Sequence, residues 1–156
     1  MDRCDFSSIM TYLKNQISES NQMSQPEFLY EIFEDFLDSP ENKEFTLDNG
    51  LVCRWMTGQA KISPKISSFY ARPSNQEKLA KTIHQNIVPL MADCDKALQD
   101  IYTLFIHDSS ISEAKKAELT SLYKPANLRL LFLAKLISFG MERPLIKRDT
   151  KNQKLI

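Results

Sequence analysis

Glycine is scarce in this sequence, with three among 156 residues. Because turn-rich sheets depend on glycine at positions of positive φ, this scarcity favours helices. Long uncharged segments are also missing: no stretch of about 18 residues lacks a charged side chain, which excludes a membrane-spanning helix. The N-terminus lacks the apolar core of a signal peptide. The sequence therefore predicts an all-α, cytoplasmic protein without a membrane segment.

Cysteine and histidine are few and widely spaced. Cys4, Cys53 and Cys94 suit neither a disulfide framework nor a zinc site, and indicate a reducing compartment. His84 and His107 have no partner at metal-ligand spacing, so we expect both at the surface. Cys53 has no histidine within about 30 residues to act as its base, and no glycine-rich phosphate loop occurs. The sequence predicts a protein that is not an enzyme and binds no metal or cofactor.

The balance of 20 basic and 20 acidic residues conceals a strong asymmetry. Residues 1–50 hold 3 Lys/Arg against 11 Asp/Glu, residues 51–90 hold 6 against 1, and residues 91–156 hold 11 against 8. A polyanion would therefore have to approach the middle of the chain. Segments of opposite sign could also pair between two copies, so self-association is one expected outcome.

The first half of the chain carries clear helix signals. Apolar residues between 6 and 17 recur at helical spacing. Ser24 and Glu27 form a capping box that predicts a second helix over 25–37. This helix carries an acidic stripe on one face, made of Glu27, Glu31, Glu34, Asp35 and Asp38. The acidic stripe is either a solvated surface or a docking site for a basic protein surface.

A central helix follows, capped by Thr46 or Asp48 and ended by Gly58, which can adopt a left-handed conformation. Ser63-Pro64 then predicts a short fourth helix over 65–71. These elements lie in an expected N-terminal bundle over residues 1–72.

The second half is also predicted to be helical. Ser74 and Glu77 form another capping box, expected to start the next long helix. The last helix, over 126–141, is apolar nearly all round. It is either the central packing helix of the C-terminal half or an exposed interface for a partner or a second copy. We therefore expect a C-terminal bundle over 73–145, packed with the N-terminal bundle, and a basic tail over 146–156.

The run from Asn49 to Pro64 resembles the third helix and following turn of phage-repressor-like helix-turn-helix domains. Val52 and Trp55 match the core positions of that helix, Gly58 matches its terminator, and Ser63-Pro64 matches the start of the fourth helix. The resemblance covers a five-element bundle in the N-terminal half. More loosely, the whole layout resembles small helical domains found beside or fused to bacterial phage-defence effectors.

The resemblance implies a DNA-binding transcriptional regulator as one hypothesis. In that family the third helix enters the major groove, where Asn49 could pair with adenine and Arg54 with guanine. The candidate contact residues, for DNA or for a protein partner, are Asn49, Cys53, Arg54, Thr57, Lys61, Lys65 and Arg72.

The other hypothesis is a protein–protein interaction or adaptor module built on the same scaffold, in bacterial or phage defence or counter-defence. The five carboxylates of the preceding helix would repel phosphates. An outward face of glycine, cysteine and threonine with one cation suits packing against another protein as well as base recognition.

Overall fold

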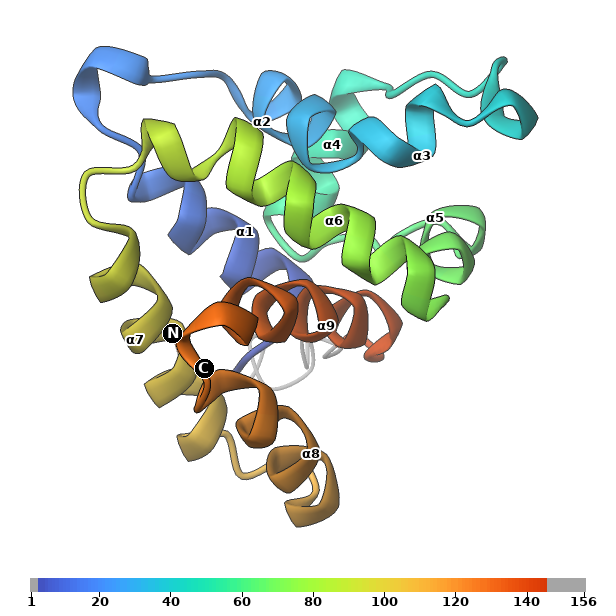
Figure 1. Cartoon of the computed structure of the whole chain (residues 1–156). Helices are drawn as coiled ribbons and strands as arrows, with labels where there is room; N and C mark the ends of the chain where they lie inside the picture. The colour runs from blue at the N-terminus through green and yellow to red at the C-terminus, as the bar shows by residue number, and fades with distance from the viewer. Residues whose placement is uncertain (1–2, 146–156) are drawn as a thin grey trace, which may run out of the picture.

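The computed structural model describes residues 3–145; the predicted basic tail over 146–156 lies outside the described residues. The described part of the chain is 73% helical and contains no strand (Figure 1), so the predicted all-α class is confirmed. The helices and 3-10 turns, in chain order, are α1 Phe6–Asn15, η1 Glu19–Asn21, α2 Gln25–Ile32, α3 Glu34–Asp38, η2 Pro40–Asn42, α4 Asn49–Met56, α5 Pro64–Tyr70, α6 Pro73–Asn86, η3 Val88–Leu90, α7 Cys94–His107, α8 Glu113–Tyr123, η4 Ala126–Leu128 and α9 Arg129–Glu142.

Local sequence signals start and stop several of these helices as predicted. At the start of α2, the Glu27 amide donates to the Ser24 hydroxyl over 3.2 Å, and the Ser24 amide donates to the Glu27 carboxylate over 3.1 Å. Asp48 caps α4 by accepting from the Gly50 amide at 3.0 Å. Gly58 follows α4 with a φ of 76°, a conformation that glycine adopts without strain. These features confirm the predicted start of α2 and the predicted start and terminator of α4.

The prediction of one continuous helix over 25–37 is wrong, because the helix breaks at Phe33, whose φ and ψ are −93° and 16°. The cause is the buried hydroxyl of Tyr70, which lies where the Phe36 amide would otherwise donate to the Ile32 carbonyl. This hydroxyl accepts from the Phe36 amide at 3.4 Å and donates to the Ile32 carbonyl at 3.5 Å. A side chain inserted into the helical hydrogen-bond ladder is a known cause of a kink. The break separates α2 from α3.

The predicted start of α6 at a Ser74–Glu77 capping box is also wrong. The helix begins at Pro73, two residues before the Asn75 that such a box predicts, and no side chain caps it. Proline has a preset φ and no amide hydrogen, so it suits the first helical position. The buried side chain of Asn75 donates to the Phe69 carbonyl at 2.9 Å, and this carbonyl, at the end of α5, also accepts from the Arg72 amide at 3.4 Å.

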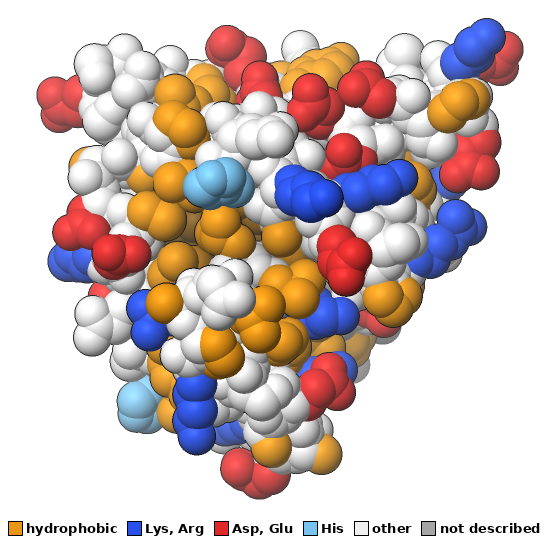
Figure 2. All heavy atoms as spheres, in the orientation of Figure 1, with side chains coloured by type: hydrophobic (Ala, Val, Ile, Leu, Met, Phe, Trp, Pro, Cys, Tyr) orange, Lys and Arg blue, Asp and Glu red, His pale blue; other side chains and the backbone are white. Residues whose placement is uncertain are grey.

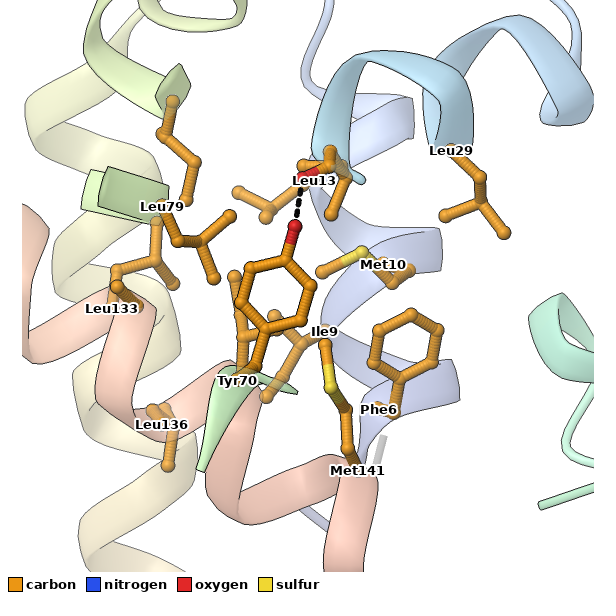
Figure 3. Close-up of a cluster of buried hydrophobic side chains, with 14 of the residues drawn as sticks. Phe6, Ile9, Met10, Leu13, Leu29, Tyr70, Leu79, Leu133, Leu136 and Met141 are labelled. Atoms are coloured by element: carbon orange, nitrogen blue, oxygen red, sulfur yellow. Dashed lines mark hydrogen bonds between the residues drawn. The ribbon is translucent and has the colours of Figure 1, made fainter. Parts of the chain in front are cut away.

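Helix α9 lies at the centre of the molecule (Figure 1) and contacts α1, α5, α6 and α8. Its close approach to α1 depends on Gly140, because a Cβ there would lie 2.8 Å from the Phe6 amide nitrogen. Figure 3 shows the ring of Tyr70 among apolar side chains of α1, α6 and α9. One continuous hydrophobic core therefore joins elements from both sides of the expected boundary at residue 72.

Helices α2 and α4, the two helices of the predicted helix-turn-helix, contact each other. The connection between them, residues 33–48, is not a tight turn, because it contains α3 and η2. Asn42 stabilises this connection by donating from its buried side-chain amide to the Phe36 carbonyl at 2.9 Å. Helices α2 and α4 are therefore joined by a structured connection and not by the tight turn of a helix-turn-helix.

Candidate partner-binding surface

The exposed face of α4 is fixed by contacts on its buried side. Val52, Trp55 and Met56 are buried, and the indole N–H of Trp55 donates to the Lys61 carbonyl at 3.1 Å. The Met56 carbonyl accepts from the hydroxyl of Ser7 at 2.8 Å, which fixes the C-terminal end of α4 against α1. These contacts turn the opposite face of α4 outwards.

The seven predicted contact residues, for DNA or for a protein, all lie at the surface: Asn49, Cys53, Arg54, Thr57, Lys61, Lys65 and Arg72 are exposed. They do not share one hollow. Lys61 borders a small hollow of about 30 Å³ beside the end of α9, whereas Lys65 borders a wider one of about 430 Å³ together with Glu41 and Glu44. Lys61 and Lys65 therefore do not line a common groove, and the hollow beside Lys65 holds Lys43 as well as the two carboxylates.

The acidic stripe is divided by the break at Phe33. Glu27 and Glu31 lie on α2, and Glu27 belongs to the capping box, where hydrogen bonds from Ser24 lower the pKa of its carboxyl. On α3, Asp35 accepts from the Thr82 hydroxyl at 2.7 Å and Glu34 accepts from the Asn86 side-chain amide at 2.6 Å. These two carboxylates of the acidic stripe therefore hold α3 against α6.

The remaining member of the acidic stripe, Asp38, is exposed at the end of α3. None of its five carboxylates joins a salt bridge within the described part of the chain. Figure 2 shows acidic side chains along the edge formed by α2 and α3, with basic side chains next to them over α6. The acidic and basic surfaces are thus neighbours in one molecule.

An open groove lies between α6 and the start of α9, and we call it the α6–α9 groove. Its volume is about 510 Å³, and it is lined from α6 by Ala80, Lys81 and His84 and from the other side by Ala126, Leu130 and Leu131. Figure 2 shows hydrophobic side chains at this place, with basic side chains along α6 above them.

The small size of two alanines explains this groove. Ala80 and Ala126 leave space between the helices, and Leu130 and Leu131 are only half-buried beside it. Further along α9, apolar side chains such as Leu136 and Ile137 are fully buried. The apolar character of the last helix is visible in the sequence, but helical periodicity does not predict that its two ends differ in burial. The small side chains of Ala80 and Ala126 are the signal that could have indicated this open space.

The cysteine side chains differ in burial and reactivity. Cys4 is fully buried, and burial, aided by the charge of Asp108, raises the pKa of its thiol to about 12. Such a thiol stays protonated at neutral pH and is a poor nucleophile. Burial also raises the pKa of the half-buried Cys94, with Asp95 adding to the effect. Cys53 is exposed on α4.

A cluster of polar side chains lies between α5, α6 and α9. The side-chain amide of Gln76 donates to the Tyr70 carbonyl at 2.9 Å and to the Ser138 hydroxyl at 3.2 Å, while its oxygen accepts from the Lys135 ammonium at 2.7 Å. The Ser138 hydroxyl in turn donates to the Tyr70 carbonyl at 2.7 Å. These groups satisfy one another, so the cluster stabilises helix packing.

Three further observations limit the functions to consider. Within residues 3–145, no group of three His, Cys, Asp or Glu side chains is placed to hold a metal ion. No helix in the same range is both long enough and apolar enough to cross a bilayer. Comparison with protein-family models, curated proteins and solved structures gives no match for this chain. Functional inference for this molecule therefore rests on its own surfaces.

Proposed function

We propose that this chain is a non-enzymatic protein-interaction module and that the α6–α9 groove is its partner-binding site. The observation that carries the proposal is the half-burial of Leu130 and Leu131 beside an open space of about 510 Å³. Removing apolar surface from water is the main driving force of most protein association. A partner side chain that entered the groove would complete the burial of α9.

The composition of the α6–α9 groove also supports this function. Its lining combines apolar side chains, such as Leu130 and Leu131, with polar or charged ones, such as Lys81 and Asn127. Protein interfaces commonly combine an apolar centre with a polar rim. The loose resemblance to defence-associated helical domains would place such a module in bacterial or phage defence or counter-defence.

Co-purification with matched variants tests this proposal. The tagged full chain, a Leu131→Glu variant and a Tyr30→Glu variant would be isolated from the native host or its infected cells under identical conditions. Tyr30 is a suitable control because its side chain is 47% exposed on α2, outside the groove. We expect a stoichiometric protein partner with the wild type and with Tyr30→Glu, and its loss with Leu131→Glu. Capture that is equal in all three would contradict the groove as the site.

DNA binding through α4 is the second candidate function. The supporting observation is the exposure of Asn49 and Arg54 on the outward face of α4, together with the exposed cations Lys61 and Arg72. This candidate predicts binding to duplex DNA that weakens as salt rises. The logarithm of the association constant should fall linearly with the logarithm of the salt concentration, with a slope of about −0.9 for each phosphate contact. Arg54→Glu should abolish binding and Lys124→Glu, on the C-terminal half, should not. Affinity that is independent of salt would exclude it.

A further inference from the structure

We propose that the element bound in the α6–α9 groove is an amphipathic α-helix of a partner protein, with acidic residues along the flank that faces α6. This inference rests on the proposed interaction function and specifies the chemistry of the partner. Three observations carry it: the shape of the groove, the distribution of charge along its two walls, and the burial of the chain's own acidic helices.

The shape of the groove suits a helix. The α6 residues that line it lie between Glu77 and Gln85 and recur at intervals of three and four, so they form one face of about two helical turns, roughly 12 Å long. The opposite wall, from Ala126 to Leu131, comprises η4 and the start of α9. A groove between two helices that is partly lined by apolar side chains can accept apolar side chains of a helix spaced at i, i+3, i+4 and i+7.

The charge differs between the two walls. The α6 wall presents Lys81 and His84, and Lys78 is exposed one turn before Lys81. Among the described residues that line the groove, Glu77 alone is acidic, and the opposite wall presents the neutral Asn127. Neither Lys78 nor Lys81 forms a salt bridge within the described part of the chain. An acidic flank facing α6 would supply the complementary charge and fix the orientation of the bound helix.

A second copy of this chain does not offer a suitable helix among its described residues. Its acidic helices are α2 and α3, but their apolar side chains are already used in the core. Phe28, Leu29 and Phe36, for example, are fully buried. Exposing them to a groove on another copy would remove several large side chains from the core and would therefore unfold part of the domain. Helices α2 and α3 therefore do not fit the groove of a second copy, and the occupant that we propose is a different protein.

Two synthetic helical peptides would test the inference. Each has about 15 residues with leucine at i, i+3, i+4 and i+7, and one carries glutamate on one flank where the other carries lysine. Fluorescence anisotropy with the full chain would measure both affinities. We expect the acidic peptide to bind at least about tenfold more tightly, as two or more charge pairs at a partly desolvated rim can provide.

Variants of the groove and of its charged wall would test whether they cause this preference. Lys78→Glu combined with Lys81→Glu should remove the preference for the acidic peptide. Lys61→Glu combined with Lys65→Glu, the same change of charge at exposed residues outside the groove, should keep it. Leu131→Glu and Ala80→Leu should each lower the affinity for both peptides at least about tenfold. Circular dichroism would test whether each variant folds. If Leu131→Glu does not fold, Ala80→Leu alone tests the role of the groove.

Three results would overturn the inference: no binding of either peptide, equal or tighter binding of the basic peptide, or binding that Ala80→Leu leaves unchanged. These failures are distinct from failure of the interaction function. If Leu131→Glu abolishes capture of the natural partner while neither the acidic nor the basic peptide is preferred, the groove is still the interaction site. In that case the inference of an acidic partner helix is wrong. If partner capture is unaffected by Leu131→Glu, the groove itself is not the interaction site.

Discussion

Asp108 and Arg143 form a buried ion pair, with the carboxylate Oδ2 2.9 Å from the guanidinium Nη1 and the two side chains only 3% and 7% exposed. The same carboxylate oxygen accepts from the Cys4 amide at 2.8 Å, and Arg143 donates to the Cys4 carbonyl at 3.1 Å. Asp108 follows α7, Cys4 precedes α1 and Arg143 follows α9. One pair of charges thus joins three distant parts of the chain.

Arg143→Met should lower the free energy of unfolding by about 3–5 kcal/mol, because it leaves the carboxylate of Asp108 buried without its partner. Urea denaturation followed by circular dichroism would measure the change. Lys96→Met is the matched control, since it removes the exposed Lys96–Asp100 pair and should hardly alter stability. A loss for Arg143→Met no greater than that of the control would show that the pair contributes little.

Acid should destabilise the fold partly through Asp108. Burial alone would raise the pKa of this carboxyl, but hydrogen bonds from Ser110, the Cys4 amide and Arg143 outweigh burial and hold the pKa well below its ordinary value. The folded-state pKa therefore lies below the unfolded value of about 3.9, so the carboxylate stabilises the fold above about pH 4 and loses this effect as the pH falls further.

Measuring unfolding free energies between about pH 5 and pH 2.5 tests this effect. The decline with acid should be less steep in Asp108→Asn than in the wild type, although the variant starts from a lower stability at neutral pH. Parallel pH profiles for the two proteins would show that Asp108 is not responsible.

Tyr70→Phe should destabilise the protein by about 1–3 kcal/mol, because the Ile32 carbonyl and the Phe36 amide lose the hydroxyl that lies between them. Hydrogen exchange of the Phe36 amide should also become faster. Tyr30→Phe removes a hydroxyl from an exposed side chain and should leave both measurements unchanged. If Tyr70→Phe is as stable as the wild type, the two backbone groups have paired with each other and the helix has become continuous.

Gly140→Ala should destabilise the fold by about 1–3 kcal/mol, in spite of the better helix propensity of alanine. The new Cβ would lie 2.8 Å from the Phe6 amide nitrogen and would force α9 away from α1. Gly50→Ala makes the same substitution in the first turn of α4, where the nearest atoms are 3.6 Å from the new Cβ. This control should be neutral or slightly stabilising in thermal denaturation. Equal behaviour of the two variants would contradict the close approach.

The features that could be predicted from the sequence depend on neighbouring residues. The capping box of Ser24 and Glu27, the cap at Asp48 and the left-handed Gly58 each act within a few positions. The break at Phe33 could not be predicted in the same way, because it depends on the hydroxyl of Tyr70, far along the chain and brought close only by tertiary packing.

In the candidate site, too, some features depend on neighbouring residues and others on tertiary packing. The exposed face of α4 could be predicted from helical periodicity, since Val52 and Trp55 define the opposite, buried side. The α6–α9 groove depends on how two helices meet, and no local pattern determines that Ala80 faces the space beside Ala126 and Leu130. Hydrogen bonds of Asp35 and Glu34 to α6 were likewise invisible in a helical wheel, because a wheel describes one helix in isolation.

The contact between the two ends of the described chain has a practical consequence. Arg3 donates from its guanidinium to the Pro144 carbonyl at 2.9 Å, beside the pair formed by Arg143 and Asp108. Leu130, in the groove, lies at the other end of α9, roughly 20 Å away along the helix axis. A short linker could therefore join residues 145 and 3 in a circular permutant, with new ends opened in the exposed connection around Lys43, and the groove would remain uncovered.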